Sequence, residues 1–297
     1  ARSRKHIKAH YSEEMATIGS FPVRLPPINF IPLISSHYPD FTFQWVAQEI
    51  EKLSFAVYKP VSYLRNDLPD EILRKYQVTA AQVQQFNQGD RETALAGMMK
   101  INFLKRLESS CCAFRETLRR TIKRIIDSVD MIDAGEGKLV ASMDDPEEES
   151  EEEEKVQLKH IDIEAWRADL MADMAILDRL HDAIKDVMTG EDSKLEKLVE
   201  HMAEAYAGVV VDSDRTKKFL IFTASSDTAE YLYEKLRGRF RSPDFAIGCL
   251  TGNSQKTNRT GQPAETFERL LADFSPNSKG RPADCNRPQI DILIATD

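Results

Sequence analysis

The sequence predicts an α/β fold joined to a large helical part, and three patterns support this prediction. The run Gln289-Ile-Asp-Ile-Leu-Ile-Ala-Thr-Asp297 is apolar without polar alternation, as is typical of a parallel strand covered by helices on both faces. A second strand of this kind is predicted at residues 217–223, before a polar turn and a helix at residues 229–236. Residues 40–207 show mainly helical periodicity instead.

Polar side chains follow both predicted strands. Thr223, Ser225 and Ser226 follow the first strand, and Thr296 and Asp297 end the second. Because parallel sheets bind ligands at the carboxyl ends of their strands, these residues are candidates for a binding site. Capping of the next helix by Ser225, Ser226 or Asp227 is the structural alternative, and the two roles are compatible.

The helical part contains one pattern that is much longer than the others. Residues 98–133 carry apolar side chains at intervals of three and four, which predicts a single helix about 50 Å long. A partner helix is predicted at residues 161–188, with Trp166 in the seam between the two. Shorter helices are expected at residues 42–55, 71–86 and 193–206.

Charge is strongly segregated along the chain. The formal net charge is -9, and nine of the eleven residues at 144–154 are Asp or Glu, so this run accounts for the whole deficit. We expect it to lie in a disordered loop at residues 135–157. The long helix should have a basic face that either solvates the helix or contacts nucleic acid. Its members are Lys100, Lys105, Arg106, Arg115, Arg119, Arg120, Lys123 and Arg124.

No pattern predicts a metal site or a membrane span. The four cysteines include no C-x-x-C pair, and they have no histidine at metal-ligand spacing. For each histidine we expect a solvated or helix-face position, and no apolar run is long enough to cross a bilayer. A reducing cytoplasm fits this composition. The residues concerned are Cys111, Cys112, Cys249, Cys285, His6, His10, His37, His160, His181 and His201.

Four segments of the last eighty residues resemble a known family in their order and spacing. They read KFLIFTASSDTAEYLYEKL, FAIGCLTGNSQ, ETFERLLADFSPNSK and QIDILIATD. Together they resemble the second RecA-like lobe of a superfamily-two helicase or translocase of the Swi/Snf type. In this comparison residues 217–228 match motif four, and Ile294-Ala-Thr-Asp297 matches the start of motif five. Arg4-Lys-His-Ile-Lys8 and Phe21-Pro-Val-Arg24 more loosely resemble segments that follow the first lobe in RapA-like members.

The resemblance implies a partial RecA-like parallel sheet with a helical insertion. Residues 1–38 would be a connector from the first lobe, residues 39–207 the helical insertion, and residues 208–297 the N-terminal part of the second lobe. It also implies sequence-independent contacts to the DNA backbone and a coupling role between lobes for Asp297. We expect the basic segment at residues 235–241 to border these contacts. The implied nucleic-acid-binding residues are Thr223, Ser225, Ser226, Thr251, Gly252, Asn253 and Thr296.

Catalysis is not expected from this chain alone. It has neither a Gly-rich phosphate loop ending in Lys-Ser/Thr nor an Asp-Glu-x-His sequence to hold magnesium. We therefore expect a piece of a longer ATP-dependent enzyme whose ATP and Mg²⁺ ligands lie mostly elsewhere. Protein partners are expected at the helical insertion. The alternatives are a motor subunit of a restriction or phage-defence system, and a non-enzymatic helical scaffold or DNA-binding module.

Overall fold

The structure is a computed structural model, and the chain divides into two units, residues 1–31 and 32–297. It describes residues 9–11, 26–31, 33–35, 37–77, 88–135, 139–140, 156–189, 192–207, 218–240, 245–259, 266–282 and 284–296. In the first unit, residues 26–31 form neither helix nor strand, as Pro26 and Pro27 lead one to expect.

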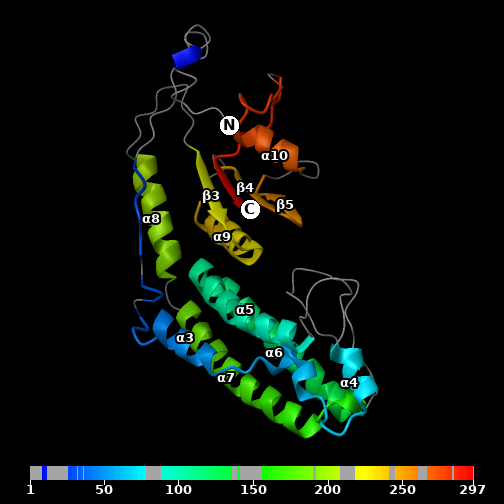
Figure 1. Ribbon diagram of the computed structural model, residues 1–297. Helices are drawn as coiled ribbons and strands as arrows, with labels where there is room; N and C mark the ends of the chain where they lie inside the picture. The colour runs from blue at the N-terminus through cyan, green and yellow to red at the C-terminus, as the bar shows by residue number, and fades with distance from the viewer. Residues whose placement is uncertain are drawn as a thin grey trace. The chain divides into compact units, whose positions relative to one another are not determined.

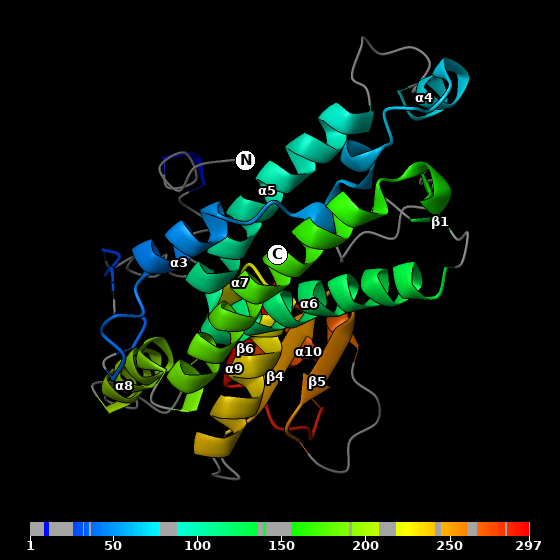
Figure 2. The same cartoon turned by 90° about the horizontal axis from the view of Figure 1, so that it is seen from below.

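The described residues between 37 and 189 of the second unit form a helical part around a single core (Figure 2). The helices α5 and α7 both pack against α6, and α3 packs against α5 and α7. Three short 3₁₀ helices (η1 to η3) connect them. The elements are α3 (Phe43–Glu51), η1 (Ala56–Tyr58), η2 (Pro60–Tyr63), α4 (Asp70–Gln77), α5 (Gln88–Ser109), α6 (Cys111–Asp133), η3 (Leu158–His160) and α7 (Ile163–Thr189).

The prediction of one long helix at residues 98–133 is wrong, because Ser110 divides it into α5 and α6. Ser110 has extended backbone angles, and its hydroxyl accepts a hydrogen bond from the amide of Ala113, as an N-cap does. The two helices then pack on each other, with the rings of Phe103 and Phe114 6.2 Å apart in an edge-to-face contact. The apolar spacing continues across the break because both helices face the same core.

The partner helix is confirmed as α7, and Trp166 is fully buried in its seam. The indole of Trp166 donates to the carbonyl of Ala56, and the carboxylate of Asp173 accepts from the amides of Ser54 and Ala56. These bonds hold Phe55 at a positive φ of 53°. The helix predicted at residues 42–55 is therefore shorter, since α3 ends at Glu51.

The predicted disordered loop at residues 135–157 is ordered at its ends. Strand β1 (Leu139–Val140) pairs antiparallel with β2 (Val156–Gln157), and the side chain of Val156 is fully buried. The acidic residues 144–154 lie outside the described part of the chain.

The rest of the second unit is an α/β part built on a four-stranded sheet (Figure 1). The strand order is β3-β6-β4-β5; β6 is parallel to both β3 and β4, and β5 is antiparallel to β4. The mixed α/β fold is thus confirmed. The elements are α8 (Ser193–Ala207), β3 (Phe219–Thr223), α9 (Ser226–Arg239), β4 (Ile247–Thr251), β5 (Ser254–Thr257), α10 (Phe267–Phe274) and β6 (Ile292–Thr296).

Helices cover both faces of the sheet at β6 but not at β3. Side chains of α8 and α9 pack with Ile292 and Ile294 on one face, and α10 packs with Leu293 on the other. The prediction of a doubly covered strand is therefore confirmed for β6. It is wrong for β3, an edge strand whose Leu220 and Phe222 are 49% and 65% exposed. Strand β5 was not predicted, because Ser-Gln-Lys-Thr has no apolar pattern.

Candidate nucleic-acid interface

Three threonines gather at the carboxyl edge of the sheet. Thr223, Thr251 and Thr296 are the last residues of β3, β4 and β6. Thr223 is in register with Thr296, and Thr251 and Thr296 directly follow the paired residues Leu250 and Ala295. Neighbouring strands lie about 4.8 Å apart, so the three side chains span about 10 Å along one edge.

All three threonines face the same side of the sheet. Side chains alternate along a strand, and Ile221, Cys249 and Ile294, two residues before the three threonines, belong to the core under α9. The hydroxyl groups therefore lie on the face that α9 covers. Helix α9 begins at Ser226, immediately after β3, so its first amide groups lie beside the same edge.

Ser225 occupies the N-cap position of α9, but its side chain does not cap the helix. No side-chain cap bond is made there, so the predicted capping role is wrong for Ser225. Ser225 is 3% exposed, and its hydroxyl instead accepts a 2.6 Å hydrogen bond from the guanidinium of Arg106. Its amide donates to Thr223 Oγ1, which in turn donates to the carbonyl of Ser225. Helix N-termini without a side-chain cap favour anions through their amides and dipole.

The motif Thr251-Gly252-Asn253 forms the tight turn between β4 and β5. Thr251 is paired with Ser254, and its side chain is buried, with 9% exposed. Gly252 and Asn253 are exposed, and a Cβ atom added to Gly252 would meet nothing within 4 Å. Of the predicted site residues, Thr223, Ser226, Gly252, Asn253 and Thr296 are thus at least partly accessible. Asp297 lies outside the described residues.

The predicted basic face of the long helix is not a continuous exposed surface. Arg106 is 8% exposed, and Arg120 makes two hydrogen bonds, of 2.9 and 2.7 Å, to Asp227 in the first turn of α9. Lys100 pairs with Glu51, and Arg119 pairs with Glu116. Two of the eight cations therefore join the helical part to the α/β part, and sequence periodicity could not identify their acidic partner.

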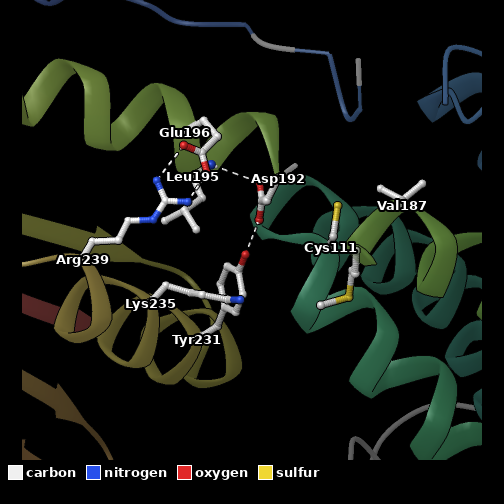
Figure 3. A pocket seen from close by; sticks show the side chains of 9 residues that line it. Cys111, Val187, Asp192, Leu195, Glu196, Tyr231, Lys235 and Arg239 are labelled. Atoms are coloured by element: carbon white, nitrogen blue, oxygen red, sulfur yellow. Dashed lines mark hydrogen bonds and ion pairs between the residues drawn. The ribbon is translucent and has the colours of Figure 1, made fainter. Parts of the chain in front are cut away.

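A cavity of about 270 Å³ lies at the other end of α9 (Figure 3). Several of its charged side chains already interact within the protein. Glu196 pairs with Arg239, and Asp192 accepts from the hydroxyl of Tyr231 and from two amides at the start of α8. Lys235 lines this cavity, so the prediction that residues 235–241 border the threonine edge is wrong for Lys235 and Arg239. Arg241 lies outside the described residues.

Metal sites require grouped ligand side chains, and membrane spans require long apolar helices. No three His, Cys, Asp or Glu side chains in the described ranges are grouped as metal ligands. His160 departs from the expected solvated position, because it is buried and its Nδ1 lies 2.8 Å from the hydroxyl of Tyr76. None of the described helices combines the length and the apolar composition that a membrane span requires.

No family model, curated protein or solved structure matches this chain.

Proposed function

We propose that the carboxyl edge of the sheet binds the sugar-phosphate backbone of DNA, as part of an ATP-dependent translocase or helicase of the Swi/Snf type. The observation that carries the proposal is the alignment of Thr223, Thr251 and Thr296 on one face of one edge, beside the uncapped start of α9. Hydroxyl groups and main-chain amides are donors that suit phosphate oxygens.

The three hydroxyls are not equally available for such a contact. Thr223 Oγ1 already exchanges hydrogen bonds with the main chain of Ser225, and Thr251 is buried with Oγ1 3.4 Å from the carbonyl of Ser254. Thr296, which is partly exposed, lies between them in the strand order. We therefore assign the central phosphate contact to Thr296, supported by the amides at the start of α9 and at Gly252.

The donor set favours a sequence-independent contact. Hydroxyls and main-chain amides that bind phosphates fix only the path of the strand and do not read its bases. A contact of this kind suits a protein that moves along DNA. No step of ATP hydrolysis is assigned to these residues.

The proposal is tested by fluorescence anisotropy with labelled single-stranded and duplex DNA of several unrelated sequences. We expect weak binding that is similar for all sequences and that weakens steeply as salt rises, because each neutralised phosphate releases about 0.7 to 0.9 counterions. A helical scaffold would show no binding at any salt concentration. That result would contradict the proposal and favour the scaffold.

A further inference from the structure

The helical part and the α/β part meet in a group of polar side chains that we call the arginine–serine joint. In the helical part it contains Arg106, Ser109, Ser110 and Arg120, and in the first turn of α9 and its N-cap it contains Ser225, Asp227 and Thr228. Arg106 bonds Ser225, and its guanidinium also lies 3.8 Å from Asp227. The hydroxyls of Ser109 and Ser110 each lie 2.8 Å from Thr228 Oγ1.

The break between α5 and α6 makes this joint possible. On one continuous helix, residues 106 and 120 would lie about 21 Å apart along the axis. Because the chain turns at Ser110, the guanidinium groups of Arg106 and Arg120 instead reach the same carboxylate, that of Asp227. The break between α5 and α6 thus brings two arginines to the first turn of α9.

From this joint a short series of bonds leads to the candidate edge. Arg106 donates to Ser225, the amide of Ser225 donates to Thr223 Oγ1, and Thr223 is in register with Thr296 on β6. Ser225 and Thr228 are 3% and 4% exposed, so a ligand at the edge does not reach this side of the joint directly. Any effect of Arg106 on binding must therefore pass through the turn between β3 and α9.

We infer that Arg106 is a positioning residue: it holds residues 223–226 and the first amides of α9 in the conformation that meets a phosphate. Its effect on binding rests on the proposed function, whereas its effect on the turn does not. Charge-assisted hydrogen bonds of a buried guanidinium are strong and directional, so they suit this task better than packing alone.

The first readout is hydrogen–deuterium exchange of the whole chain, which requires no ligand. Replacing Arg106 with Ala should speed exchange of the amides at residues 223–229 by about tenfold, the effect of losing one charge-assisted hydrogen bond, while α7 exchanges as before. Arg119→Ala is the matched control, since Arg119 is exposed on α6 and pairs with Glu116. Unchanged exchange at residues 223–229 in Arg106→Ala would overturn the inference.

The second readout is DNA affinity across a salt series. A positioning role predicts that Arg106→Ala weakens binding about three- to tenfold without changing the salt slope. The substitution would lower only the fraction of molecules in which residues 223–226 have the conformation that binds a phosphate. A direct phosphate contact would lower the magnitude of the slope by about 0.7 to 0.9, and would overturn the positioning role. If the unaltered chain binds no DNA, the proposed function fails, and exchange alone decides the inference.

One further variant keeps the test decisive if Arg106→Ala does not fold. Ser225→Ala removes the acceptor and leaves the guanidinium beside Asp227, and it should reproduce the faster exchange. Where both single variants fold, the double variant should exchange no faster than Arg106→Ala, because both changes break the same bond. Fully additive effects would show that Arg106 acts by another route, and would contradict the inference.

Discussion

The two edges of the sheet are built in opposite ways. At the amino edge, Asp273 is fully buried and lies within hydrogen-bond distance of Arg259, Arg281 and Arg287, while Lys218 donates to the carbonyls of Phe274 and Ile290. At the carboxyl edge, threonine hydroxyls and a turn with free space at Gly252 replace these ion pairs. Ion pairs therefore tie the chain together at the amino edge, whereas at the carboxyl edge the ion pairs of Asp227 with Arg106 and Arg120 join the helical part to α9 and leave Gly252 and part of Thr296 exposed.

The largest effect on stability is expected at the amino edge. In Asp273→Asn, three arginines lose their shared carboxylate, which should lower the free energy of unfolding by about 3–5 kcal/mol. Urea denaturation measures this loss, and Glu268→Gln in the exposed first turn of the same helix should cost less than about 1 kcal/mol. Equal losses in the two variants would mean that the arginine cluster does not hold this edge.

The pH dependence of the free energy of unfolding should also reveal the arginine cluster around Asp273. Burial alone would raise the pKa of Asp273, but the hydrogen bonds from Arg287 and Arg259 outweigh burial and lower it. Because the pKa of Asp273 is lower in the folded state, its ionised carboxylate stabilises the fold at pH values above 3.8. This stabilisation is lost as the pH falls below 3.8 toward the folded-state pKa. The acid limb of the stability curve should therefore be shallower in Asp273→Asn.

Two buried carboxylates of the helical part, those of Asp173 and Glu92, accept from main-chain amides instead. Asp173 accepts from the amides of Ser54 and Ala56 and from the hydroxyl of Ser54. Asp173→Ala should cost about 2–4 kcal/mol in urea denaturation, because it leaves two amides without an acceptor beside the strained Phe55. Asp178→Ala, on the exposed face of the same helix, should cost less than about 0.5 kcal/mol. A loss of less than about 1 kcal/mol in Asp173→Ala would show that the turn around Phe55 keeps its conformation without the carboxylate.

Glu92 should give the helical part a pH response opposite to that of Asp273. Burial raises the pKa of Glu92 from 4.5 to about 8, although its hydrogen bonds with the amides of Val61 and Ser62 oppose the shift. The folded state then binds the proton more tightly, so the free energy of unfolding should fall as pH rises from 4.5 to 8.

Glu92→Gln should remove this fall, which for a pKa shift from 4.5 to about 8 amounts to about 5 kcal/mol. Urea denaturation at several pH values measures it, with Glu108→Gln on the exposed face of the same helix as the control. A slope that persists in Glu92→Gln would assign the pH response to another group.

The sequence predicts those parts of the fold that depend on long local patterns. Helix α7 and strand β6 follow directly from their apolar spacing, and the position of Ser225 follows from the end of β3. The break at Ser110 could not be predicted, because Leu107, Cys111 and Phe114 keep helical spacing across it. Strand β5 was missed because its polar residues form an edge that only its pairing with β4 defines.

The candidate site was predictable in position but not in its bonding. Strand ends placed Thr223 and Thr296 at one edge, since the carboxyl ends of parallel strands meet there. The use of Arg106 and Arg120 inside the joint depends on Asp227, more than one hundred residues away in the sequence. Charge pattern alone cannot distinguish such a buried arginine from one on a solvated helix face.

The most direct test of the binding edge places one charge at Gly252, where a side chain has room. Gly252→Glu should weaken DNA binding by about tenfold at low salt, because it sets a carboxylate against the phosphates, whereas the uncharged Gly252→Gln should bind like the unaltered chain. Gly97→Glu makes the same change at an exposed position of helix α5 and should have little effect on binding. With circular dichroism confirming that all three variants fold, equal affinities of Gly252→Glu and Gly252→Gln would contradict the account.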